Sequence, residues 1–399
     1  MDVLVLGNGF DLAHKLPTTY LCFLKTTGYI TKLQNFDGLS IGRIFESLQN
    51  DCGDIANSYC TYKSVYDDYA LDPKRLKLLR KWCKSTEWWL YFKKTFNKNV
   101  GWIDFEKEIA IVVNKIKDFL YRYYKSTTSI DLSKKGSEII KYFDFFIEQG
   151  IQEHMQIFDS TKVYYRYKSD YIIKHGNDQA DEIDKRKIAI DLFQSLTEFS
   201  EILSLYFEVF VDEPLEKLKI NKLISTVDAY REYPNVITYN YTNSLERLYD
   251  NKAAHIHGSL GSKIILGINS NVDDDGGVDL SFIDFKKYYQ RVIFKTDLDY
   301  LSILTEMKRV LLAGGIVTLS IIGHSLDYSD KDSLEELFDS SNKINVYYHR
   351  EDNLPEYVQK IIKIFGKAKF DELRFYKNLQ FFKQEDFSGP PPLVEAIRI

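Results

Sequence analysis

Four side chains that could take part in catalysis each follow a short apolar run of the sequence. Each run has the length and the residue types of a buried β-strand. The carboxyl ends of parallel strands meet at one edge of a sheet, and open α/β sheets bind their ligands at that edge. We therefore expect the four side chains to converge on one cleft. They are Asp11, Asn240, His257 and His324.

Each of these residue types also has an ordinary structural explanation. An unperturbed histidine titrates near pH 6.5, which suits His257 to general-base catalysis, but a lone buried histidine is more often a hydrogen-bonded core residue. His255 and His257 lie two apart, so on a strand both would face the same side, and that spacing also suits a metal pair. Asn240 and His324 could simply occupy turns.

The turn Gly7-Asn8-Gly9 follows the first apolar run directly. Glycines allow backbone N–H groups to approach a pyrophosphate closely. The third glycine of the dinucleotide fingerprint is missing, so a plain tight turn remains an equal interpretation.

Composition limits the class of protein. The 399 residues carry a net charge of −5 and show no basic patch, which argues against nucleic acid as a partner. The four cysteines form no Cys-x-x-Cys pair, as expected for free thiols in a reducing cytosol. We expect a cytoplasmic protein that does not enter the membrane, because a leader segment and a run of about 18 apolar residues are both missing.

The alternation of apolar runs and amphipathic stretches predicts an α/β fold with a parallel sheet. Residues 1–40 would form the first part of a Rossmann-like core and residues 230–399 the second part. Between them, residues 41–229 read as a large, all-helical insertion, because apolar residues recur there at helical spacing. The longest expected helices cover residues 73–97, 103–124, 137–158 and 183–210.

Four segments, taken in order, resemble landmarks of the sirtuin family. They are the glycine turn with Leu16-Pro17 six residues after Phe10, Thr238-Tyr239-Asn240-Tyr241-Thr242 ahead of Leu245-Glu246-Arg247, His257-Gly258, and Ile322-Gly323-His324-Ser325-Leu326. The resemblance implies a sirtuin-like Rossmann core that binds NAD as a substrate, with no metal expected. Thr18, Thr19 and Tyr20 replace the acidic-Phe-Arg segment of sirtuins, and no zinc module is present. These departures argue against protein deacylation and leave cleavage of the nicotinamide–ribose bond by water.

The sirtuin resemblance also implies a role for each site residue. Asn240 would position the attacking water, His257 would act as general base, and Asp11 would stabilise the developing positive charge on the ribose. Residues around the nucleotide would be Gly7, Asn8, Gly9 and Phe10 at the pyrophosphate, Phe10 and Pro17 at the nicotinamide, Thr242 and Gly258 beside the catalytic residues, and Gly323, His324, Ser325 and Asp327 along the adenosine half.

A second resemblance covers most of the chain. Five separated motifs, in the right order, look like the bacterial AbiH family, which is named for abortive infection by phage. They are Leu6-Gly7-Asn8-Gly9-Phe10-Asp11-Leu12-Ala13-His14 with Leu16-Pro17-Thr18-Thr19-Tyr20, Trp102-x-Asp104-Phe105-Glu106, Tyr239-Asn240-Tyr241-Thr242, His255-Ile256-His257-Gly258, and Gly323-His324-Ser325-Leu326-Asp327 with Asp330. The resemblance implies an antiphage role and leaves a phage trigger, a defence partner protein and a homo-oligomer open.

Two other functions compete with NAD hydrolysis at the same residues. A metal-dependent phosphodiesterase or nuclease could use Asp11, His255, His257 and His324 as ligands. A non-catalytic sensor could bind NAD or ADP-ribose without consuming it. A purely structural scaffold fits poorly with so many polar residues at strand ends.

Overall fold

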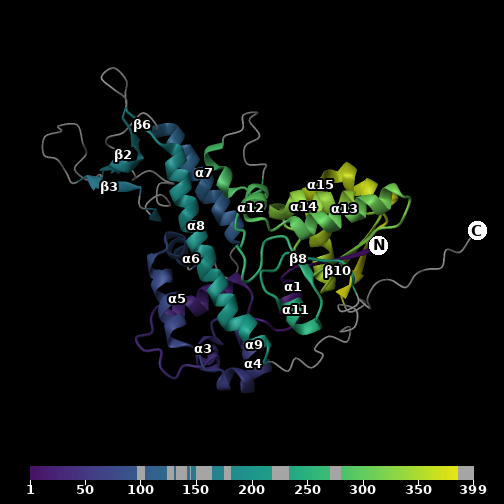
Figure 1. The fold of residues 1–399 in the computed structure, drawn as a ribbon, viewed down its shortest axis with the longest axis horizontal. Helices are drawn as coiled ribbons and strands as arrows, with labels where there is room; N and C mark the ends of the chain where they lie inside the picture. The colour runs from purple at the N-terminus through teal and green to yellow at the C-terminus, as the bar shows by residue number, and fades with distance from the viewer. Residues whose placement is uncertain are drawn as a thin grey trace, which may run out of the picture. The chain divides into compact units, whose positions relative to one another are not determined.

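The computed structural model describes residues 1–96, 104–123, 130–131, 142–143, 145–149, 164–174, 181–217, 233–269 and 280–384 (Figure 1). The chain forms two compact units. The first unit comprises Met1–Arg80, Glu201–Ile265 and Arg291–Ile399, and the second comprises Lys81–Ser200 and Leu266–Gln290.

The first unit is built on a six-stranded sheet in which every pairing is parallel. The strand order is β11-β10-β9-β1-β7-β8. The strands are β1 (Asp2–Leu6), β7 (Val236–Thr238), β8 (Ala253–His255), β9 (Thr318–Ile322), β10 (Lys343–Tyr348) and β11 (Leu379–Lys383). The predicted parallel α/β sheet, which joins the first strand to strands from the C-terminal half, is therefore confirmed.

Strand β1 lies in the middle of the sheet and is buried on both faces. Val3 and Val5 pack into the apolar core on one face, and Leu4 and Leu6 pack into the core on the other. All four side chains are at most 1% exposed. Burial on both faces explains why the sequence of β1 is continuously apolar instead of alternating.

The register of the sheet aligns the carboxyl ends of its central strands. Leu6 at the end of β1 pairs with Ile322 at the end of β9 and with Thr238 at the end of β7. Thr238 in turn pairs with His255 at the end of β8. The residues that follow these four strands therefore begin side by side at one edge of the sheet.

Helices account for most of the remaining described residues. The α-helices of at least five residues are α1 (Gly9–Ala13), α2 (Tyr20–Ile30), α3 (Ile41–Leu48), α4 (Gly53–Asp68), α5 (Pro73–Ser85), α6 (Glu87–Phe96), α7 (Phe105–Tyr123), α8 (Lys185–Phe207), α11 (Ser244–Tyr249), α12 (Lys287–Phe294), α13 (Leu298–Leu312), α14 (Lys331–Asp339) and α15 (Leu354–Tyr376). Among the described residues, no helix combines the length and the apolar character needed to cross a membrane.

The inserted region is not all helical, which corrects the sequence prediction. Short antiparallel strands β2 (Ile130–Asp131), β4 (Tyr164–Tyr167) and β3 (Phe146–Gln149) form one sheet, and β5 (Ile172–Ile173) pairs with β6 (Glu182–Ile183). The helix expected at 137–158 is wrong at β3, and most of its other residues lie outside the described part of the chain. Aromatic and β-branched residues dominate these strands and favour extended backbone, which outweighs a chance helical spacing. The insertion boundaries at residues 40 and 229 stay a prediction.

The loops after β1 and β9 touch backbone to backbone. Gly323 has a φ of +66°, and a Cβ there would lie 2.6 Å from the Phe10 nitrogen. A Cβ on Gly7 would lie 2.5 Å from the His324 Cα, and one on Gly9 would lie 2.6 Å from the Gly323 Cα. Glycine is thus required at three positions by lack of space, and at Gly323 also by its backbone conformation.

Replacing Gly323 with alanine should separate these two requirements. Gly38 has nearly the same φ, +67°, but nothing lies within 4 Å of a Cβ placed there. Gly38→Ala is expected to lower the free energy of unfolding by about 1 kcal/mol through backbone strain alone. Gly323→Ala should lower it by about 3 kcal/mol, because the clash with Phe10 adds to the strain. Urea unfolding of the two variants measures the difference, and equal losses would show that the close contact costs nothing.

Candidate functional site

The edge of the sheet where β1, β7, β8 and β9 end carries two groups of polar side chains, both in the first unit. The first group, the Asp11 cluster, consists of Asp11, Thr242, Ser244, His255 and Glu246. The second group, the Asp330 cluster, consists of Asp330, His257, His324 and Tyr239. The predicted catalytic residues Asp11 and His257 thus belong to neighbouring but separate groups of polar side chains.

In the Asp11 cluster, a buried carboxylate is held by two hydroxyl groups. Thr242 Oγ1 donates to Asp11 Oδ2 at 2.6 Å, and Ser244 Oγ donates to Asp11 Oδ1. Asp11 is 1% exposed. Burial raises the pKa of Asp11 to about 6, although the hydrogen bonds from Ser244 and Thr242 lower it. Asp11 is therefore an acid that titrates close to neutral pH.

His255 belongs to the same cluster and pairs with a carboxylate. Its Nε2 lies 3.0 Å from Glu246 Oε1, and its Nδ1 lies 3.0 Å from the Asn240 carbonyl oxygen. Burial lowers the pKa of His255, but the hydrogen bond and charge of Glu246 outweigh it, and the net pKa is raised. The cation that results lies close enough to Asp11 to favour its charged form.

In the Asp330 cluster, one carboxylate lies between two histidines. Asp330 Oδ1 is 3.3 Å from His257 Nε2, and Asp330 Oδ2 is 3.5 Å from His324 Nε2. The Leu326 N–H donates to His324 Nδ1 at 2.9 Å, which leaves the proton of a neutral His324 on Nε2, facing Asp330. All three side chains are at most 10% exposed.

Tyr239 fixes both imidazole rings. Its ring meets His257 edge-on with centroids 5.1 Å apart, and it meets His324 at 4.2 Å. Its hydroxyl group bonds to Ser333 Oγ on α14 at 2.7 Å. Asn240 follows Tyr239 directly and is 7% exposed. Its carbonyl oxygen forms a hydrogen bond with His255 Nδ1. The backbone at the end of β7 therefore joins the two clusters.

His255 and His257 do not share a face, contrary to the sequence prediction. β8 ends at His255, and the chain then turns, with the Gly258 N–H donating to the His255 carbonyl oxygen at 3.1 Å. Strand alternation therefore does not extend to His257. Among the described residues, Asp11, His255, His257 and His324 also do not bring their donor atoms together as one metal-binding group. This geometry does not support the phosphodiesterase alternative.

The glycine turn directs its N–H groups into the protein. Gly7 N–H donates to the Ile322 carbonyl oxygen, Gly9 N–H to that of Gly323, and Phe10 N–H to that of Gly7. Asn8 receives a hydrogen bond from the Thr18 hydroxyl at 2.6 Å. A pyrophosphate held by the N–H groups of residues 7, 9 and 10 would have to replace these bonds.

The other expected nucleotide contacts have structural roles here. Phe10 is 1% exposed and packs against His14 and Tyr249, and the Pro17 carbonyl accepts from the Tyr206 hydroxyl at 2.8 Å. Gly258 has a φ of +76°, and a Cβ there would lie 1.9 Å from the Lys263 oxygen. Asp327 caps a short turn by accepting the Ser329 N–H at 3.0 Å, and Ser325 is exposed.

The remaining motif lies in the second unit, and Trp102 falls outside the described residues. Asp104 accepts the Lys107 N–H at 3.1 Å at the start of α7. Glu106 forms a buried ion pair with Lys287 at 2.7 Å. Both contacts lie within the second unit. They show that Asp104 and Glu106 stabilise its fold.

Four members of the two clusters, Tyr239, Ser244, Glu246 and Asp330, were not predicted as site residues, and His255 was predicted only as a possible metal ligand. Ser244 and Glu246 begin α11, and Asp330 immediately precedes α14. Serine and acidic residues are common at helix starts for reasons of capping alone, which hides any further role. The signal that the sequence offered for them was their position, two to six residues after the polar residues that follow the strands.

Comparison with known proteins matches residues 3–349 to the family described as Bacteriophage abortive infection AbiH. The chain belongs to the AbiH family. Membership places it among proteins of phage defence by abortive infection. No curated protein and no solved structure matches the chain, so the sirtuin-like character of this AbiH sheet stays a prediction.

The raised pKa of Asp11 predicts a pH-dependent stability for this AbiH protein. Because the folded pKa of about 6 exceeds the ordinary value of 3.8, the folded state binds the proton more tightly than the unfolded chain. The resulting stabilisation is complete below about pH 4 and is lost as the pH rises through 6.

Asp11→Asn removes this titration. The difference in free energy of unfolding between wild type and the variant should therefore fall by a few kcal/mol from pH 4 to pH 7, since one pKa unit corresponds to about 1.4 kcal/mol. Urea unfolding across that range measures it, with the exposed Asp37→Asn as control. A difference that does not vary with pH would mean that Asp11 is not destabilised by burial.

Proposed function

We propose that this AbiH protein acts in phage defence as a hydrolase that cleaves the nicotinamide–ribose bond of NAD at the carboxyl edge of β1, β7 and β8. The observation that carries the proposal is the pairing of His257 Nε2 with Asp330 Oδ1 at 3.3 Å. A carboxylate beside one ring nitrogen is the arrangement that lets the other nitrogen work as a base.

The chemistry at His257 follows from this pairing. The carboxylate of Asp330, 3.3 Å from His257 Nε2, is placed to stabilise positive charge on the ring when a neutral His257 accepts a proton from a water molecule. As the water oxygen bonds to the anomeric carbon of the ribose, nicotinamide leaves with the electrons of the C–N bond. The water proton passes to the His257 ring, and Asp330 stabilises the imidazolium that forms.

Neighbouring residues supply orientation and charge. Asn240, at the end of β7, positions the water or a ribose hydroxyl. Asp11 is largely ionised at neutral pH, because its pKa is about 6, and its negative charge favours a ribose that develops positive charge in the transition state. Activity is therefore expected to decline as the pH falls below 6.

The choice of NAD rests on the four segments that resemble sirtuins and on the defence role of the family. Hydrolysis of NAD would stop the metabolism of an infected cell, which is the outcome that abortive infection requires. His257 is 4% exposed and Asp11 is 1% exposed. A substrate of this size needs the site to open, which suits an enzyme that is silent until a phage signal, a partner protein or self-association activates it.

The first test is nicotinamide release from NAD, followed by chromatography. Wild type, His257→Ala, Asp330→Asn and Asn240→Ala are compared, with and without lysate from phage-infected cells. Loss of a general base typically costs about 10²–10⁴-fold, so His257→Ala should lose at least about 100-fold of the rate. The exposed His349→Ala serves as the matched control and should keep full activity.

Two outcomes would overturn the proposal. NAD turnover that persists in both His257→Ala and Asn240→Ala would place the chemistry elsewhere. Stoichiometric binding of NAD or ADP-ribose with no product under activating conditions would identify a nucleotide sensor.

A further inference from the structure

A second group of reactive side chains lies in the first unit, between the starts of α2 and α4. Cys22 is in the first turn of α2, and Cys52 is the N-cap residue of α4. Their sulfur atoms are 3.4 Å apart, and the two residues are 0% and 2% exposed. The structure thus buries two thiols in direct contact.

A carboxylate completes this group. The sulfur atoms of Cys22 and Cys52 and a carboxylate oxygen of Asp54 all lie within 4.8 Å of one another. The Thr19 hydroxyl lies 3.0 Å from Cys22 Sγ and 3.2 Å from Asp54 Oδ2. One hydroxyl therefore holds a sulfur and a carboxylate in a fixed relation.

The two thiols differ in acidity. The hydrogen bond from Cys22 lowers the pKa of Cys52, and the N–H groups of Asp54 and Ile55 at the start of α4 act in the same direction. Burial raises the pKa of Cys22 well above its usual range, and the neighbouring Cys52 sulfur raises it further. The contact between the two sulfur atoms thus acts in opposite directions on the pKa values of the two thiols.

We propose that Cys22, Cys52 and Asp54 bind a divalent cation of the zinc class. Zn²⁺ takes thiolate ligands at about 2.3 Å and carboxylate oxygens at about 2.0–2.2 Å in a tetrahedron. Two sulfur atoms of such a tetrahedron lie about 3.8 Å apart, so the 3.4 Å contact needs only small side-chain rotations. Binding releases two thiol protons to solvent.

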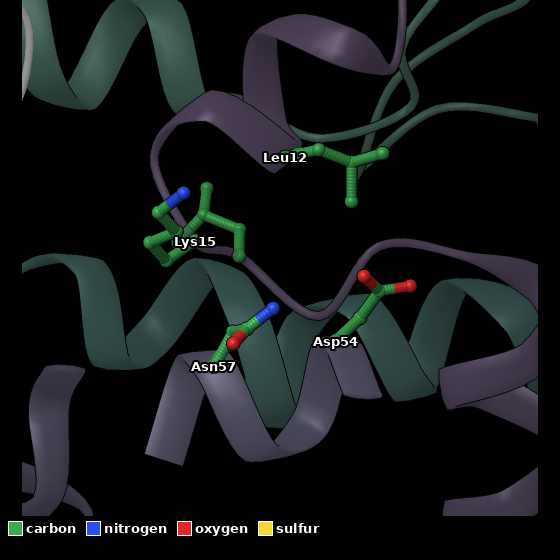
Figure 2. Close-up of a pocket in the computed structure, with 5 residues that line it drawn as sticks. Leu12, Lys15, Asp54 and Asn57 are labelled. Atoms are coloured by element: carbon green, nitrogen blue, oxygen red, sulfur yellow. The ribbon is translucent and has the colours of Figure 1, made fainter. Parts of the chain in front are cut away.

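A small cavity reaches one ligand of the group, Asp54, and offers room for a water molecule as the fourth ligand. Asp54 also lines a cavity of about 140 Å³ together with Leu12, Lys15, Leu16 and Asn57. Figure 2 shows Asp54 and Asn57 on α4 opposite Leu12, which belongs to α1, and Lys15, which lies in the loop after α1. Water from this cavity would fill the fourth position. Two thiolates, one carboxylate and a divalent ion leave one negative charge, which the Lys15 ammonium offsets.

The site is independent of the proposed hydrolase. Its ligands come from α2 and α4, and none belongs to the Asp11 or Asp330 cluster. Leu12, Lys15 and Leu16 nevertheless follow Asp11 directly along the chain. Bound metal would therefore stiffen the end of α1 and the loop after it, without taking part in chemistry at His257.

The test is titration of the reduced, chelator-treated, full-length protein with Co²⁺, a spectroscopic substitute for Zn²⁺. Wild type should bind one Co²⁺ with absorption bands typical of thiolate-to-metal charge transfer, and Zn²⁺ should displace it. Cys22→Ser and Cys52→Ser should lose these bands. Changing an outer-shell residue costs about 10–100-fold in affinity, so Asp54→Asn, which loses a direct ligand, should bind at least about tenfold more weakly.

The other two cysteines supply matched controls. Cys60→Ser and Cys83→Ser change an exposed and a buried thiol outside the group, and both should keep the wild-type titration. At the same Zn²⁺ concentration, the thermal unfolding midpoint should rise less for Asp54→Asn than for wild type; Asp54 is a half-buried position where folding should be retained.

Three results would overturn the proposal. The first is a wild type without charge-transfer bands. The second is a band that survives in Cys52→Ser or disappears in Cys60→Ser. The third is loss of two of the four thiols to a disulfide in air with no metal uptake by the reduced protein, which would identify a redox pair instead.

Discussion

The close approach of the loops after β1 and β9 is the constraint on which the site depends. Backbone contacts backbone between Gly7, Gly9 and Gly323, so the two loops leave the sheet as one packed layer. This contact sets where α1 starts, and hence where Asp11 enters the interior. It also fixes the turn in which the Leu326 N–H donates to His324 Nδ1 and so selects the tautomer of that ring. The glycines thus position catalytically capable side chains, whether or not they contact a nucleotide.

The two clusters at the sheet edge stabilise charge in different ways. Asp11 relies on hydroxyl groups, which lower its pKa only in part, and burial keeps it near neutrality. Asp330 instead lies between two imidazole rings that an aromatic ring holds in place. One side of the edge therefore offers a titratable acid, and the other offers a polarised base. In the hydrolysis proposed above, the ionised form of Asp11 favours positive charge on the ribose, and His257 beside Asp330 accepts the proton of the water.

The sequence was most informative where burial on both faces dictated the pattern. The runs at 2–6 and 318–322 could hardly be anything but central strands, and the strand ends then located Asp11, Asn240, His257 and His324 at one edge. Their partners could not be found in this way. Asp330 and Glu246 look like ordinary helix-start residues, and the separation of His255 from His257 depends on β8 ending after three residues. In the insertion, aromatic residues at helical spacing concealed strands, because pairing with a distant segment decided their conformation.

The order of the strands has a consequence for how the chain is made. Thr242 and Ser244 lie 231 and 233 residues beyond Asp11, the residue that they hold. β1 acquires its neighbours only when β7 and then β9 have emerged from the ribosome. At about 5–20 residues per second, this most apolar strand waits roughly 15–60 s for its second partner. A chain whose synthesis stops before β9 has emerged therefore has no assembled site.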